Sequence, residues 1–117
     1  MAAVTVYHNP RCTKSRQALA VVEDLGAEVD VVRYLDNPPN AAVLRGIIAK
    51  LEDPIADLVR RERWDELGVT ADDLATADGV VEVLVRHPQL LQRPLLVSAH
   101  RAVIGRPTER VTELLGG

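Results

Sequence analysis

The hydrophobic positions in the first third of the chain follow a strand pattern, then a helix pattern, then a strand pattern again. Residues 3–7 (AVTVY) are mostly β-branched or aromatic and precede turn residues, which predicts a short β-strand. In residues 13–25 the hydrophobic side chains recur at helical spacing, and Gly26 is suited to ending that helix. Residues 28–35 (EVDVVRYL) alternate well enough for a second strand. A strand, a helix and a strand within about thirty residues favour parallel pairing through a right-handed crossover.

The middle of the chain has a helical pattern throughout. Asn40 is a suitable cap for a helix whose hydrophobic residues lie three or four positions apart. Further helical patterns follow around residues 55–63, 71–74 and 79–85, and His87-Pro88 closes the stretch. Ten of the 17 acidic residues lie between positions 52 and 82, so this segment carries much of the negative charge.

The last part of the chain returns to short strands. Residues 95–97 and 102–104 are apolar runs joined by a turn, which predicts a pair of strands. A last helix is expected to start within residues 105–108, to place its hydrophobic side chains on one face, and to end at Gly116-Gly117.

This order of elements indicates the fold class. A β-α-β unit, a helical insertion at about residues 40–88 and a β-β-α unit follow one another, which is the order of an α/β, thioredoxin-like fold with an inserted helical subdomain. A chain of 117 residues has room for one hydrophobic core. We therefore expect a single domain that spans residues 1–117.

Composition narrows the classes of function. The chain is 47% hydrophobic and 26% charged, as in ordinary globular proteins. Its net charge of −3 argues against a general role on nucleic acids or membrane surfaces, and 3% aromatic residues leave few platforms for stacking bases. No secretory signal and no run approaching the ~18 apolar residues of a membrane helix are visible. Without a disulfide pair, a cytoplasmic location is expected.

The chain has one cysteine, Cys12, at the predicted start of the first helix. A single cysteine excludes an internal disulfide and any metal site built from cysteines alone. At a helix start, free backbone N–H groups and the helix dipole stabilise a thiolate, so the pKa should fall and the thiol should be reactive. The alternative is a small buried residue that fills space. A polar turn among basic residues fits that alternative poorly.

Residues beside Cys12 bear on its chemistry. Ser15 could donate a hydrogen bond to the sulfur, and His8 lies close enough in sequence to approach it across the turn. Ser15 also stands where the redox motif C-x-x-C needs a second cysteine, so an oxidised Cys12 must be resolved by an external thiol. Ala18 stands where the phosphatase-type motif C-x5-R needs arginine. His8 and Cys12 alone are weak evidence for a metal, and we expect none.

Three arginines are candidate ligands for an anion. Arg60 lies in the insertion, and Arg93 and Arg106 each precede a proline, at the start of the third strand and of the last helix. In a thioredoxin-like sheet the loop before the third strand lies beside the start of the first helix, so Arg93 could face Cys12. Several guanidinium groups together suit a tetrahedral oxyanion. The alternatives are salt bridges to nearby acids for Arg60 and solvated loop positions for the other two. The isomer of Pro94 cannot be determined from the sequence.

Five segments together resemble a known family. The chain is similar over nearly its whole length to the ArsC-type, glutaredoxin-linked arsenate reductases, and above all to their short ArsC-like members. The segments that carry the resemblance are residues 7–16 (YHNPRCTKSR), 34–39 (YLDNPP), 58–60 (LVR), 93–97 (RPLLV) and 104–107 (IGRP).

The resemblance implies a function in arsenical resistance. Cys12 matches the nucleophile that attacks arsenate, and Arg60, Arg93 and Arg106 match the arginines that hold the oxyanion. His8 and Ser15 match residues that favour the thiolate. The family binds no cofactor; a small thiol such as glutathione attacks the arsenate adduct, glutaredoxin resolves the mixed disulfide, and arsenite leaves.

Two other functions remain open at this stage. One is a regulator that resembles the Spx proteins, which share the fold and contact RNA polymerase. Ser15 argues against the C-x-x-C form of that switch, and the three arginines argue for anion chemistry. The other is a different thiol-disulfide reductase that uses the same cysteine.

Overall fold

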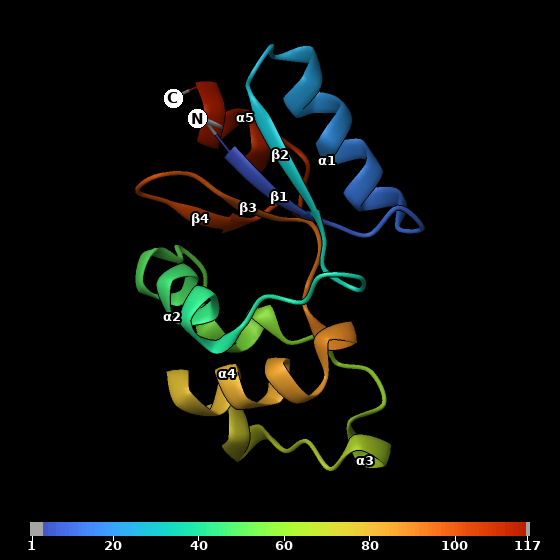
Figure 1. Cartoon of the computed structure of the whole chain (residues 1–117), viewed down its shortest axis with the longest axis vertical. Helices are drawn as coiled ribbons and strands as arrows, with labels where there is room; N and C mark the ends of the chain where they lie inside the picture. Colours follow the sequence, from blue (N-terminus) through green and yellow to red (C-terminus); the bar gives the residue numbers. More distant parts are fainter. Residues whose placement is uncertain (1–3, 117) are drawn as a thin grey trace.

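Four short strands form one mixed sheet in the computed structural model, which describes residues 4–116 (Figure 1). The strands are β1 (Val4–His8), β2 (Val29–Arg33), β3 (Leu95–Val97) and β4 (Ala102–Ile104), and their order in the sheet is β2-β1-β3-β4. β1 pairs parallel with β2, whereas the β1–β3 and β3–β4 pairs are antiparallel. The carboxyl end of the central strand β1, and the cysteine that follows it, therefore lie at one end of the sheet.

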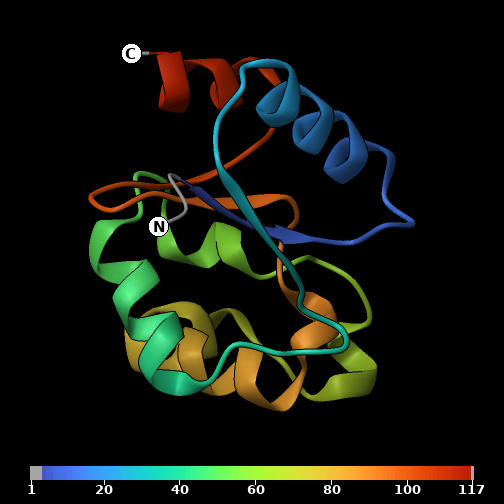
Figure 2. The same cartoon turned by 45° about the horizontal axis from the view of Figure 1, so that its top comes forward.

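Helices cover both faces of the sheet (Figure 2). Helices α1 (Thr13–Asp24) and α5 (Glu109–Gly116) lie on one face. The other face is covered by the helical insertion, which comprises α2 (Ala41–Lys50), η1 (Ile55–Leu58), α3 (Trp64–Leu67), η2 (Ala71–Leu74), α4 (Ala77–Arg86) and η3 (Pro88–Leu90). Each side has its own buried cluster, the one under the insertion being the larger. This is the predicted α/β, thioredoxin-like fold with an inserted helical segment.

The predicted β-α-β unit is present with shifted boundaries. The first strand extends to His8, and Ala3 lies outside the described residues. The second strand ends at Arg33 because the chain turns there: the carbonyl of Arg33 accepts the N–H groups of Asp36 at 3.0 Å and Asn37 at 2.9 Å. Tyr34, predicted to be within the strand, instead begins this turn and is fully buried.

The predicted helix at residues 55–63 is wrong beyond its first turn. Only η1 is helical, and Val59 then forms an isolated antiparallel bridge with Leu91. The Arg60 N–H donates to the Leu90 carbonyl at 2.7 Å, and the Gln92 N–H donates to the Leu58 carbonyl at 2.8 Å. These long-range bonds replace the bonds that would have continued the helix. As a result, Arg60 lies beside the segment that leads into β3.

The remaining helices follow the sequence more closely. Asn40 caps α2 by accepting the Val43 N–H at 2.9 Å, as predicted. The last helix begins at Glu109, just beyond the expected start, and its expected end at Gly117 lies outside the described residues. Within residues 4–116, every helix is too short or too polar to cross a membrane.

Candidate active site

Cys12 lies at the amino end of α1, where the chain leaves β1. It is the N-cap residue, with extended backbone angles (φ −92°, ψ 121°), and its own N–H donates to the Asn9 carbonyl at 3.0 Å. The thiol is half-buried, and the first turn of α1 contains no acidic residue. The sulfur therefore lies beside the unpaired backbone N–H groups at the start of the helix, as the sequence predicted.

The surroundings of Cys12 favour its thiolate. Burial by itself would raise the pKa of the thiol, but the backbone N–H of Ser15, the Arg93 guanidinium and the backbone N–H of Lys14 together outweigh it. The pKa of Cys12 is consequently lowered from its ordinary value. A lowered pKa gives a larger thiolate fraction at neutral pH, and the thiolate is the nucleophilic form.

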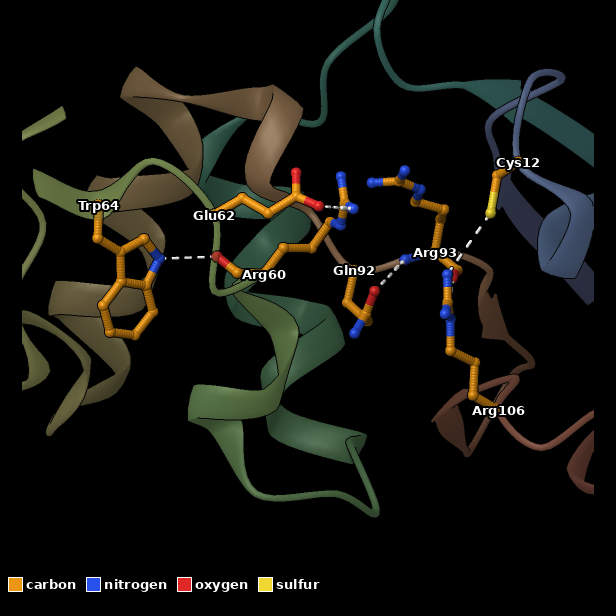
Figure 3. A network of polar contacts seen from close by, with 7 residues as sticks. All are labelled: Cys12, Arg60, Glu62, Trp64, Gln92, Arg93 and Arg106. Atoms are coloured by element: carbon orange, nitrogen blue, oxygen red, sulfur yellow. Dashed lines mark hydrogen bonds and ion pairs between the residues drawn. The ribbon is translucent and has the colours of Figure 1, made fainter. Parts of the chain in front are cut away.

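Arg93 and Arg106 come from the two ends of the β3–β4 hairpin and meet at the cysteine (Figure 3). The Arg106 side chain donates from Nη2 to the Cys12 sulfur at 3.5 Å and from Nε to the Arg93 carbonyl at 2.7 Å. The backbone N–H of Arg93 donates to Oε1 of Gln92 at 3.2 Å. Both the Arg93–Pro94 and the Arg106–Pro107 peptide bonds are cis.

Arg60 reaches the same place from the helical insertion. Figure 3 shows its guanidinium turned toward that of Arg93, while its carbonyl accepts the Trp64 indole N–H at 2.7 Å. Arg60 also pairs with the Glu62 carboxylate, so the salt bridge considered for it from the sequence does form. Arg60 and Arg106 both line a cavity of about 420 Å³, whose lining includes neither Cys12 nor Arg93. Figure 3 shows all three candidate arginines on one side of the thiol.

His8 and Ser15 form a pair of their own next to the cysteine. The Ser15 hydroxyl oxygen accepts the Asn9 N–H at 3.0 Å and lies 2.6 Å from Nδ1 of His8. The expected hydrogen bond from this hydroxyl to the sulfur is therefore replaced, because the hydroxyl faces His8. Burial, followed by the charges of Arg33 and Arg16, lowers the pKa of His8, so its imidazole is neutral at pH 7. Ser15 acts on the thiol through its backbone N–H.

Across residues 4–116, histidine, cysteine, aspartate and glutamate side chains do not gather in any group of three or more that could hold a metal ion.

Comparison with known proteins identifies the family. The model of the ArsC family matches residues 7–114. The chain belongs to the ArsC family. The uncharacterized protein YfgD of Escherichia coli (strain K12) is 39% identical over 116 residues, which cover 97% of this chain and 97% of YfgD. The arsenate reductase of Neisseria meningitidis serogroup B is 37% identical over 118 residues, which cover 98% of this chain and 100% of that protein.

Solved structures agree with the family assignment. An arsenate reductase from Vibrio cholerae superposes on this ArsC-family chain with a TM-score of 0.83 at 33% identity, covering 97% of this chain and 98% of that one.

An activated thiol with several guanidinium groups on one side of it is suited to nucleophilic attack on a tetrahedral oxyanion.

Tyr34 is a residue of this region that sequence analysis did not select as a site residue. Its ring is fully buried. Burial raises the pKa of its hydroxyl, and Arg93, Asn9 and Cys12 also act on that pKa. In the sequence it reads as an ordinary strand aromatic within residues 28–35. Only the parallel pairing of His8 with Arg33 reveals that the next residue lies beside the loop leading to the cysteine.

Proposed function

We propose that this ArsC-family protein reduces arsenate to arsenite, with Cys12 as the nucleophile and Arg60, Arg93 and Arg106 as ligands of the oxyanion. The observation that carries the proposal is the meeting of Arg106 with the Cys12 sulfur at 3.5 Å, beside the Arg93 guanidinium that lowers the pKa of the thiol. Relatives named arsenate reductase, similar over nearly the whole chain, support the choice of substrate.

The first step is attack by the Cys12 thiolate on arsenic. A sulfur–arsenic bond forms, one oxygen of arsenate leaves as water after protonation, and arsenic remains As(V). Arsenate carries negative charge on its oxygens, and guanidinium groups fixed in a partly water-excluded site stabilise that charge without reorganising. The same positive charges favour the thiolate before the substrate arrives and the oxyanion once it has bound.

The second step needs a thiol from outside the chain. A glutathione-type thiolate attacks the sulfur of Cys12, a disulfide bond forms, the sulfur–arsenic bond breaks, and its electron pair stays on arsenic as As(III). Arsenite leaves, and a glutaredoxin-like protein reduces the mixed disulfide. In total, two thiols are oxidised to one disulfide and two electrons reach arsenic. Cys12 is the single cysteine of the sequence, which is why a partner inside the chain cannot supply the second thiol.

A coupled turnover assay tests this function. With arsenate, glutathione, glutaredoxin, glutathione reductase and NADPH, the wild-type protein should oxidise NADPH only when arsenate is present. Cys12→Ser should lower that rate at least about a hundredfold, because the covalent step is lost. Arg93→Ala and Arg106→Ala should raise KM for arsenate. Arg101→Ala should leave KM unchanged, because Arg101, in the turn between β3 and β4, pairs with Glu52 instead. Unchanged turnover in Cys12→Ser, or no turnover by the wild type, would contradict the proposal.

A further inference from the structure

Two buried polar side-chain atoms near the site lack a hydrogen-bond partner among residues 4–116. They are the hydroxyl oxygen of Tyr34 and Nε of Arg93. Tyr34 has 0% of its surface exposed. Buried tyrosine hydroxyls nearly always find a partner, because an unpaired buried polar group destabilises the fold. Two such atoms in one region of a small protein indicate a position arranged for a polar ligand.

The sheet register places these two groups side by side. β1 and β2 pair His8 with Arg33 in parallel, so Tyr34 follows on level with Asn9. β1 and β3 pair Tyr7 with Leu95 in antiparallel fashion, so Arg93 lies level with Asn9 from the other side. Tyr34 therefore lies just beyond the end of β2 and Arg93 just before β3, both next to Asn9, where the chain turns into Cys12. Asn9, Arg93 and Cys12 all act on the Tyr34 hydroxyl, which agrees with this placement.

Electrostatics agree with this placement. Burial raises the pKa of Tyr34. The Arg93 charge and the closeness of the Asn9 and Arg93 side chains to the hydroxyl offset part of that rise, and the Cys12 charge adds to it. Both side chains are near the hydroxyl, but neither forms a hydrogen bond of good geometry with it. The Arg93 guanidinium and the Cys12 thiolate thus both act on the Tyr34 hydroxyl. Its raised pKa keeps it protonated at neutral pH, as a donor that can also accept.

We propose that the Tyr34 hydroxyl donates a hydrogen bond to the oxyanion held between Cys12 and Arg93, as a fourth binding group besides the three arginines. This inference rests on the proposed function. A neutral hydroxyl adds what guanidinium groups cannot, because it donates to an ionised arsenate oxygen and accepts from a protonated one. The ring, packed in the cluster under the insertion, fixes the direction of the hydroxyl.

Protection of Cys12 from alkylation tests the inference directly. The rate of Cys12 modification by iodoacetamide is measured against arsenate concentration, and the concentration for half-maximal protection is compared between variants. Tyr34→Phe removes the hydroxyl alone and should raise that concentration about tenfold or more, as expected for the loss of a hydrogen bond to a charged group. Tyr7→Phe is the matched control: Tyr7 is also buried, on the neighbouring strand, and should stay within about twofold of wild type.

Two further readouts separate binding from structure and from thiol activation. The thermal midpoint of Tyr34→Phe should equal or exceed that of the wild type, because the variant loses an unpaired buried hydroxyl. Without arsenate, the pH midpoint of Cys12 alkylation should match wild type.

Each contrary result has a distinct meaning. If arsenate half-protects Tyr34→Phe at the same concentration as it half-protects the wild type, the inference is overturned and the proposed function stands. A shifted pH midpoint with unchanged protection also overturns it, because Tyr34 would then act on the thiol. A wild-type protein that arsenate does not protect overturns the proposed function, and the inference with it.

Discussion

At the scale of single residues, the reactivity of Cys12 has a local and a distant source. The backbone N–H groups of Ser15 and Lys14 belong to its own helix start, and they follow from the sequence once that helix is expected. The Arg93 guanidinium comes from a position 81 residues away (93 − 12), brought there by the pairing of β1 with β3. The direction of the Ser15 hydroxyl toward His8 depends on side-chain packing, which no local pattern encodes.

The first prediction at this scale concerns pH. Because the pKa of Cys12 is lowered, the rate of its alkylation should reach half-maximum at a pH below the ~8.5 of an ordinary thiol. The rate rises with pH because only the thiolate reacts, so a lowered pKa moves the whole curve to lower pH. Arg93→Gln should move the midpoint upward, since it removes a charge that favours the thiolate.

The control for that titration is Arg11→Gln. Arg11 is next to Cys12 in the sequence but its side chain is exposed, and solvent screens such charges strongly. Its midpoint should stay at the wild-type value. A wild-type midpoint at or above ~8.5, or equal shifts in both variants, would show that the thiol is not activated by Arg93.

At the scale of elements, the β3–β4 hairpin holds two of the three arginines together. The Gly105 N–H donates to the Pro94 carbonyl at 2.8 Å, so the segments that carry Arg93 and Arg106 are joined at their base. A Cβ at Gly105 would lie 2.7 Å from Cδ1 of Leu96 and 2.9 Å from Cγ of Pro94, closer than real contacts allow. Glycine at this position therefore permits the close approach that brings Arg106 to the thiol.

Gly105→Ala tests that approach. The variant should lower the free energy of unfolding by about 1–3 kcal/mol through overpacking, and it should weaken arsenate binding because Arg106 is displaced. Gly46→Ala is the control, since Gly46 lies inside α2 with nothing within 4 Å of an added Cβ; it should gain up to about 1 kcal/mol. Urea unfolding measures both variants. Equal stability of the two would show that the hairpin tolerates the extra methyl group.

The insertion shows where prediction from the sequence fails at this scale. The helices α2 and α4 follow from periodicity and capping residues, because those signals act within a few positions. The helix expected at residues 55–63 breaks at Val59, whose partner Leu91 is distant in sequence. A helical pattern cannot report a backbone bridge that tertiary contacts create. That bridge is also what brings Arg60 to the site.

At the scale of the whole molecule, the site lies where two parts of the chain meet. The strand-rich part supplies Cys12, Arg93 and Arg106, and the insertion supplies Arg60, with the guanidinium groups gathered on one side of the thiol (Figure 3). The element order predicted the thioredoxin-like sheet, and the motifs predicted Cys12 and the three arginines as site residues. The net charge of −3 was a poor guide to an anionic substrate, because local arginines rather than total charge surround the thiol.

The most direct test of the central claim is a crystal structure of the wild-type protein soaked with arsenate, with anomalous scattering used to locate arsenic. The account predicts one arsenic peak within covalent bonding distance of the Cys12 sulfur, with its oxygens bound by Arg60, Arg93 and Arg106. An arsenic atom bound elsewhere, or bound near Cys12 without contact to these arginines, would contradict it.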